Sequence, residues 1–464
     1  MENNKEKYIH IFGIIVFSLT FVILLIIYGI CYTPDSYGYL AMDIIREPVY
    51  PLFLAILRKI FGEEVYPKLT VIFQILLAVY AVFSFCKNIT KRFNIKGRYI
   101  VCVYLLLYVY YFMALPLYMI IKLDSPLVTF PLTILTEGVT YSLYLLYIKS
   151  LILAGCDGDY KNLSIAMGYA CLMSLIRAGL MPTIIATVIV GIYISITRKN
   201  KIKKSITVFG MGILAFVFIF IFENVYFFIV HGCLMTHTYG SVTTLSNIMY
   251  TADETDKDKI EDESLKEIFI GTYKEMCENS CGYNVEPCLN LIERGIHIEK
   301  CHDFIKFTAF GNSIGKKYDE LNIVGGIEKG IYNDNIARKL SKILLKAHVG
   351  RWLEGYISLC IQGYIRTVAY APQSLFMRVF TCMVTILYIG GLVLLRKNKD
   401  IITYLLITLL SIFGIVLSTS LVIMCMTRYM VYNFVVFYTG FIIMWCNRKE
   451  CLDSIKSKVG KGGE

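Results

Sequence analysis

Charged residues are scarce in this chain and are confined to a few short stretches. Aspartate, glutamate, lysine and arginine make up only 17% of the 464 residues, whereas hydrophobic residues make up 56%. Soluble domains average about 45–50% apolar residues. The scarcity of charge therefore argues against a soluble protein, and the mean hydropathy of +0.61 points to lipid.

The apolar runs also lack the alternation of apolar and polar residues that barrel strands require. They are continuous and about 17–25 residues long, which is the length that spans a bilayer as a helix. Because only helices and closed barrels satisfy every backbone hydrogen bond in lipid, the sequence predicts an all-α polytopic membrane protein.

Metal-binding patterns are missing from the cysteines and histidines. Of 15 cysteines, most lie in apolar segments, where cysteine behaves as a small hydrophobe. Five fall in the long polar segment: Cys233, Cys277, Cys281, Cys288 and Cys301. Their spacing fits no zinc site, so we predict disulfide staples or free thiols there, in a connectivity that spacing does not reveal. No metal ligand is assigned.

The net charge of +11 is concentrated where short cytoplasmic loops are expected. The basic residues form clusters at 87–98, 198–204, 396–399 and 448–458, each after an apolar segment. Such clusters are typical of the cytoplasmic side of membrane proteins. We therefore interpret them as determinants of topology and expect the bilayer, and no nucleic acid, as a partner.

The hydrophobic pattern predicts about ten transmembrane helices with both chain ends in the cytoplasm. The predicted spans cover residues 8–30, 66–86, 99–120, 137–154, two parts of 163–197, 205–230, 375–395, 401–423 and 429–446. The stretch 163–197 is divided near Arg177, because a single crossing would place the basic cluster 198–204 outside.

This topology divides the chain into three parts. We predict an N-terminal membrane region at 1–230, an extracytoplasmic loop domain at 231–350 and a C-terminal membrane region at 351–464. The first loop contains a half-apolar segment, about residues 51–61, which is too short to span and is expected to lie along the outer interface.

Ionisable residues near the ends of spans are costly to place and are the first candidates for function. On the predicted outer side they come from several chain regions: Asp35, Asp43, Arg46, Glu47, Lys122, Asp124, Glu137, Arg177 and Arg428. If the first loop is helical from Asp35, then Asp35, Tyr39 and Asp43 share one face. Arg46 is a candidate ligand of a phosphate group.

Each of these residues also has an ordinary structural explanation. Asp35 would serve as a helix N-cap, and Arg46 would pair with Asp43 or Glu47. Glu137 suits a helix N-terminus. Arginines at the ends of spans reach toward lipid headgroups.

The ordered set of motifs resembles the GT-C membrane glycosyltransferases, nearest to the protein mannosyltransferase and lipid A aminoarabinose transferase group. The motifs are Asp35-Ser36-x-x-Tyr39, Arg46-x-Pro48-x-Tyr50-Pro51, Thr136-Glu137, Arg177 and Arg428-Tyr429, with the segment 337–365 before a late span. The resemblance covers most of the chain except 231–330.

This resemblance implies sugar transfer from a polyprenyl-phosphate donor to an extracytoplasmic glycan, lipid or protein acceptor, at the cell membrane. It implies Asp35 as the catalytic carboxylate base of an inverting displacement. Arg46, Lys122, Arg177 and Arg428 would bind the donor phosphate, and the substrate pocket would include Tyr39, Asp43, Tyr50, Glu137 and Tyr429. Family members often carry a second acid beside the first, whereas Ser36 follows here, so a divalent metal cofactor stays undecided.

Two other classes use similar features. A polysaccharide polymerase or ligase also takes polyprenyl-linked sugars, but favours a long late loop rich in arginine, and here the first part of that loop is acidic. A transporter or flippase of lipid-linked sugars would favour internal repeats and charges at the midplane. This sequence has no evident repeat, and its charges lie at the ends of the spans.

Overall fold

The computed structural model describes residues 4–112, 129–197 and 201–448, without the side chains of residues 201 and 202. Within these ranges every regular element is a helix, and one isolated β-bridge joins Cys31 to Thr133. Eight helices among the described residues are long and apolar enough to cross a membrane. The prediction of a polytopic helical membrane protein is confirmed.

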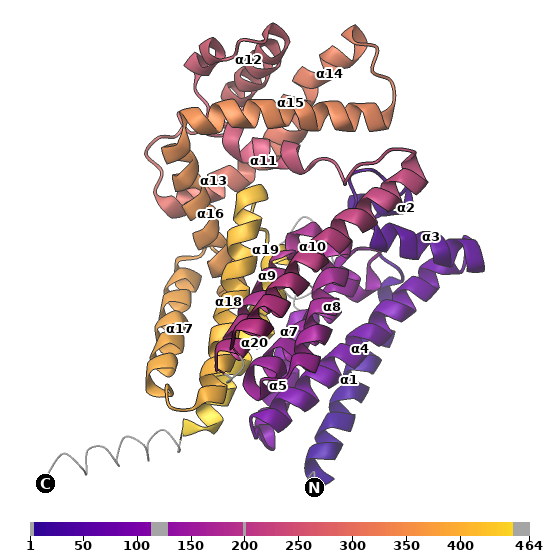
Figure 1. Cartoon of the computed structure of the whole chain (residues 1–464), viewed down its shortest axis with the longest axis vertical. Helices are drawn as coiled ribbons and strands as arrows, with labels where there is room; N and C mark the ends of the chain where they lie inside the picture. The colour runs from indigo at the N-terminus through magenta and orange to yellow at the C-terminus, as the bar shows by residue number, and fades with distance from the viewer. Residues whose placement is uncertain (1–3, 113–128, 198–200, 449–464) are drawn as a thin grey trace, which may run out of the picture.

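The helices of membrane length follow the predicted order along the chain (Figure 1). They are α1 (Asn4–Tyr28), α4 (Tyr66–Arg92), α7 (Glu137–Asp157), α9 (Pro182–Thr197) with its preceding turn, α10 (Lys201–His231), α17 (Leu375–Leu394), α18 (Lys399–Val422) and α20 (Phe434–Cys446) with α19 (Thr427–Met430) before it. The predicted ten also include α5 (Arg98–Phe112) and α8 (Tyr160–Ile176), of which 15 and 17 residues lie within the described ranges.

The stretch 163–197 forms two helices and not one. Helix α8 ends at Ile176, Arg177 has an extended backbone, and α9 begins at Pro182. Proline suits the first position of a helix because it has no N–H to donate and its φ angle is already helical. The break leaves Arg177 at one end of the bundle.

Helix α7 lies inside the bundle, where it packs against α4, α8 and α18. Sixteen of the 21 residues of α7 are buried, whereas α1, α10 and α17 leave most of their apolar side chains exposed at the periphery. An exposed apolar surface of this extent is what a lipid-facing helix requires.

The end of α4, the start of α5 and the turn between α17 and α18, which belong to the basic clusters of the sequence, lie at the same end of the bundle (Figure 1). Arg92 at the end of α4 pairs with Asp157 of α7 at 3.0 Å and with Asp400 of α18 at 2.9 Å. Trp445 of α20 donates a hydrogen bond to the Tyr99 hydroxyl of α5 at 2.9 Å.

The opposite end of the bundle carries a layer of helices with its own apolar core (Figure 1). These helices are α11 (Gly240–Met249), α12 (Glu263–Glu278), α13 (Leu291–Asp303), α14 (Phe310–Glu320) and α15 (Gly326–Ala347). We call them the loop domain. Helix α16 (Val349–Ala369) packs against α13 and leads the chain back to the bundle.

Candidate active site

Asp35 lies in the short helix α2 (Pro34–Leu40), just after the first membrane helix. The N-cap of this helix is Thr33, whose backbone N–H donates to Ser36 Oγ at 2.9 Å. Asp35 is therefore not the N-cap that its position suggested. The buried Ser36 closes the start of the helix instead.

The Asp35 carboxylate is held between two arginines from distant parts of the chain. Arg46 Nη2 donates to Oδ1 at 2.9 Å, and Arg428 Nη1 donates to Oδ2 at 3.2 Å. Arg46 thus pairs with Asp35 and with neither Asp43 nor Glu47. Burial alone would raise the pKa of Asp35, but attraction to Arg428 and Arg46 outweighs burial and lowers the pKa below its ordinary value.

Arg46 reaches Asp35 by lying flat over helix α2. Its guanidinium carbon is 4.6 Å from the centre of the Tyr39 ring, a cation–π contact. A Cβ atom added at Gly38 would lie only 2.7 Å from Arg46 Nε. Glycine at this position is what allows the arginine to come so close.

Glu137 begins helix α7 and is almost fully buried at the same end of the bundle. Its Oε1 lies 2.7 Å from Arg177 Nη1 and 3.8 Å from Arg428 Nε, and Thr136 donates to its Oε2 at 3.0 Å. Burying a carboxylate costs several kcal/mol unless cations and donors compensate. Arg177 has a side chain only 17% exposed, so it is paired inside the protein and does not extend toward headgroups.

Tyr429 contacts both arginines that lie near Glu137. Arg177 lies over its ring at 4.2 Å from the centroid, and Arg428 donates to its hydroxyl at 2.9 Å. Arg428 is therefore shared by Asp35, Glu137 and Tyr429, and it links the two carboxylates into one cluster.

Tyr39 and Tyr50, which were also predicted as site residues, pack beside the cluster. The Tyr39 hydroxyl lies 3.3 Å from Thr136 Oγ1, and its ring meets the Tyr50 ring edge-on at 5.3 Å. Tyr50 is fully buried and donates to Gln74 Oε1 at 2.8 Å. Tyr50 thus positions Tyr39 and does not itself touch the charged groups.

Asp43 does not join the cluster. Helix α2 ends at Leu40 and Met42 has a positive φ of 53°, so the shared face runs only from Asp35 to Tyr39. Asp43 Oδ1 accepts a hydrogen bond from the Ile45 N–H at 3.3 Å, which closes the following turn. Lys122 lies outside the described residues.

Backbone contacts bring these separate segments together. Cys31 accepts from Ile134 and donates to Leu132, both at 3.0 Å, which ties the first loop to the start of α7. Glu47 Oε1 accepts from the Ala178 N–H at 2.7 Å, which ties the same loop to the break between α8 and α9. The first loop, which carries Asp35, is thus hydrogen-bonded both to the segment before Glu137 and to the residue after Arg177.

Two charged residues of the loop domain, on the side that meets the first loop, were not predicted from the sequence. Asp303 ends α13, and Lys306 lies in a π-helical turn, Phe304–Ala309, between α13 and α14. The Lys306 ammonium lies 4.7 Å from the centre of the Tyr239 ring, and the neighbouring Thr238 N–H donates to the Ile44 carbonyl of the first loop at 2.9 Å. The only sequence signal was a lone lysine between Ile305 and Phe307.

The donor set of the site suits an anion better than a cation. Both oxygens of Asp35 face arginines, and Glu137 also faces two. In the part of the chain that the structure describes, no group of three or more His, Cys, Asp or Glu side chains could hold a metal ion. Arginine forks match phosphate oxygens in geometry and charge, so these residues fit a phosphate group and do not fit a divalent metal.

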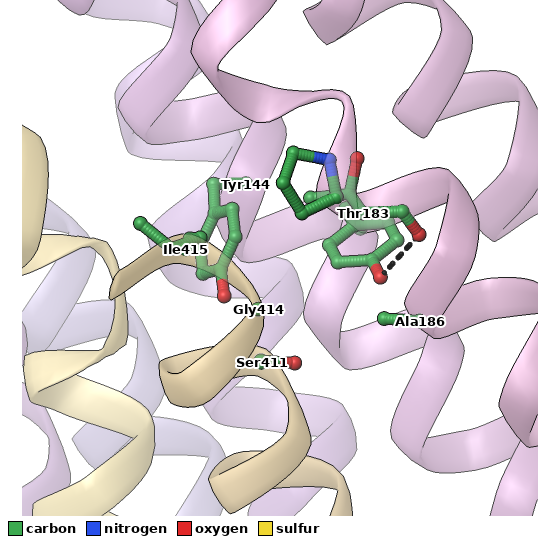
Figure 2. Close-up of a pocket in the computed structure, with 8 residues that line it drawn as sticks. Tyr144, Thr183, Ala186, Ser411, Gly414 and Ile415 are labelled. Carbon is green, nitrogen blue, oxygen red and sulfur yellow. Dashed lines mark hydrogen bonds between the residues drawn. The ribbon is translucent and has the colours of Figure 1, made fainter. Parts of the chain in front are cut away.

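A small pocket lies deeper in the bundle, between α7, α9 and α18 (Figure 2). It is lined by Tyr144, Tyr147, Pro182, Thr183, Ala186, Ser411, Gly414 and Ile415. Tyr147 donates across it to the Thr183 carbonyl at 2.9 Å. None of these lining side chains is ionisable at neutral pH, so the pocket offers no acid or base, in contrast to the cluster around Asp35.

No known protein family, curated protein or solved structure matches this chain. The assignment of function therefore rests on the geometry of the Asp35 cluster and on the order of its motifs.

Proposed function

We propose that this protein is a membrane glycosyltransferase that moves a sugar from a polyprenyl-phosphate donor to an acceptor on the extracytoplasmic side. The observation that carries the proposal is the position of Asp35, held between Arg46 and Arg428 at one end of the helix bundle. Glu137 and Arg177 extend the same cluster.

The chemistry follows from the charges. The acceptor hydroxyl oxygen attacks the anomeric carbon from the face opposite the phosphate, and its proton passes to the Asp35 carboxylate. The bond between the anomeric carbon and the phosphate oxygen breaks, and the polyprenyl phosphate leaves with the electron pair. The leaving group gains negative charge in the transition state, so arginines beside it lower the barrier.

Both carboxylate oxygens of Asp35 accept hydrogen bonds from Arg46 and Arg428. Arg46 Nε and Arg428 Nε are buried and have no hydrogen-bond partner among the described residues, although Arg428 Nε lies 3.8 Å from Glu137. A donor phosphate would satisfy these N–H groups and compete for the arginines. Donor binding would thereby release Asp35 to act as the base.

The surroundings of the site suit a lipid-linked donor. Helix α3 (Val49–Phe61) directly follows the first loop, which carries Asp35 and Arg46. It buries Tyr50 and Leu54 and exposes Ile60 and Phe61 near Arg58. An amphipathic helix of this kind lies in the membrane interface. A polyprenyl chain could then stay in the bilayer while its phosphate reaches the arginines.

The direct test is transfer of labelled sugar by the purified protein in liposomes. We expect transfer from a polyprenyl-phosphate sugar and none from a nucleotide sugar, with inversion at the anomeric carbon. Addition of a single sugar distinguishes this proposal from a polymerase. Movement of the intact donor across the bilayer without transfer would contradict it and favour a flippase.

Replacing Arg428 with alanine is expected to lower turnover by about 10²–10³-fold, because the arginine stabilises charge that develops on the leaving phosphate. Lysine should restore activity only in part, since it lacks the planar fork that serves Asp35, Glu137 and Tyr429. The measurement is kcat with the donor at saturation. Arg58→Ala is the matched control, and normal kcat in Arg428→Ala would make Arg428 a structural residue.

The proposed orientation predicts which loops are exposed on each side of the membrane. Single cysteines introduced at Lys96, Lys203 or Lys397 into a protein without exposed thiols should react with an impermeant reagent only from the cytoplasmic side. A cysteine at Lys266 in the loop domain should react only from outside. Labelling of Lys203 from outside would contradict the proposed topology.

A further inference from the structure

Arg366 is a buried arginine in the last turn of α16, the helix that returns from the loop domain to the bundle (Figure 1). Its residue is only 4% exposed. Nη1 donates to the backbone carbonyl of Cys425 at 2.5 Å, and Nη2 donates to Glu299 Oε2 of α13, also at 2.5 Å. The fixed fork of a guanidinium can serve two such partners at once. Arg366 therefore joins the loop domain to the segment that precedes Arg428.

That segment, residues 423–426, lies between two helices and depends on its neighbours for its position. Helix α18 ends at Val422, Ile423 has an extended backbone, and α19 begins only at Thr427. Cys425, in the middle of the segment, is fully buried. Because buried carbonyl groups need hydrogen-bond donors, the guanidinium of Arg366 stabilises this segment where it lies.

Close packing from two sides adds to this hold. Gly363 lies one turn before Arg366 on α16, and a Cβ atom added there would lie only 2.9 Å from Cys425 Sγ. From the other side, the Tyr141 hydroxyl of α7 donates to the Arg428 carbonyl at 2.9 Å. The backbone that carries Arg428 is thus fixed by side chains of α16 and α7.

Arg428 has to be placed accurately, because one guanidinium serves three groups. It lies 3.2 Å from Asp35 Oδ2, 3.8 Å from Glu137 Oε1 and 2.9 Å from the Tyr429 hydroxyl. A displacement of about 1 Å can lower the rate of a reaction about 10²-fold. A contact that fixes the backbone three residues before Arg428 therefore bears on the charge that Arg428 offers to the leaving phosphate.

We infer that Arg366 is a positioning residue that holds Arg428 at the site, and that the loop domain takes part in this through Glu299. The inference rests on the proposed function and deepens it. Contacts and backbone form a continuous path from the loop domain to the proposed base, in the order Glu299, Arg366, Cys425, Arg428 and Asp35. Packed, hydrogen-bonded paths of this kind can couple one part of a protein to another.

The first test is a double-mutant cycle on kcat with the donor at saturation. Arg366→Met should lower kcat about 10–100-fold, because Arg428 is no longer held in place. Arg366→Lys should restore only part of the loss, since lysine lacks the planar fork. The double variant Arg366→Met/Arg428→Ala should be no slower than Arg428→Ala, because nothing is left to position. Losses that multiply in the double variant would mean that Arg366 acts independently of Arg428 and would overturn the inference.

Arg351→Met is the matched control. Arg351 also lies on α16, donates to the backbone carbonyl of Thr251 at 3.3 Å and pairs with Asp253 at 3.4 Å. These contacts stay within the loop domain, so this variant should keep the kcat of the wild type.

The second test reads the same contact without any activity. N-ethylmaleimide is applied to the full-length protein in detergent, well below the melting temperature of each variant, and modification of Cys425 is followed by mass spectrometry. The thiol should be protected in the wild type and in Arg351→Met, and should react faster in Arg366→Met. Equal protection in Arg366→Met would overturn the inference and leave the proposed function standing. Absence of sugar transfer by the wild type would contradict the proposed function, and labelling would still decide whether Arg366 holds the segment before Arg428.

Discussion

Asp35→Asn is expected to abolish sugar transfer, with a loss of about 10²–10⁴-fold in rate, while the protein stays folded. Asparagine keeps the size of the side chain and one hydrogen-bond acceptor but cannot take the acceptor proton. The measurement is single-turnover transfer from a labelled polyprenyl-phosphate sugar, together with a melting curve.

The fold should tolerate this change better than the loss of Glu137, because Asp35 does not start its helix and its carboxylate is partly exposed to water, whereas Glu137 is buried. Thr33 and Ser36 close the N-terminus of α2, and the Asp35 side chain is 34% exposed. Arg46 and Arg428 keep their contacts with Tyr39 and Tyr429. Both arginines also lose their competing carboxylate, so we expect Asp35→Asn to bind undecaprenyl phosphate at least as tightly as wild type does.

Asp43→Asn is the matched control for this prediction. It makes the same chemical change eight residues later in the same loop, where the carboxylate only closes a turn. Normal transfer is expected. Normal transfer by Asp35→Asn would remove the general base from the mechanism, and weaker donor binding would contradict the competition between Asp35 and the phosphate for the arginines.

Much of this arrangement could be predicted from sequence because it depends on local patterns. Continuous apolar runs predicted the helices, and the basic cluster 198–204 required the break near Arg177, which the structure contains. The charges at one end of the spans also come together there, since short loops leave little freedom in where Asp35, Glu137 and Arg428 lie.

The partners of these charges could not be predicted, because they depend on packing between distant segments. Arg46 lies three and one residues from Asp43 and Glu47 in sequence, yet it pairs with Asp35, since the turn after Leu40 folds it back over Gly38. Lys306 was overlooked for the same reason. Its position depends on how the loop domain packs against the first loop, and no periodicity in the sequence records that contact.

Glu137→Gln is expected to cause the largest loss of stability, about 3–5 kcal/mol, because it leaves the Arg177 guanidinium buried without its counter-charge. The measurement is thermal unfolding of the protein in detergent. Glu63→Gln is the matched control, because its pair with Arg58 is exposed and such pairs contribute about 0–1 kcal/mol.

The double variant Glu137→Gln/Arg177→Met separates stability from function. Removing both charges leaves no uncompensated ion between Glu137 and Arg177, so most of the lost stability should return. Transfer should not return, because Arg428 still lacks the carboxylate 3.8 Å away that helps to orient it toward Asp35, and the leaving phosphate lacks the charge of Arg177. Recovery of both stability and transfer would mean that the pair serves only the fold, and the phosphate site would then consist of Arg46 and Arg428 alone.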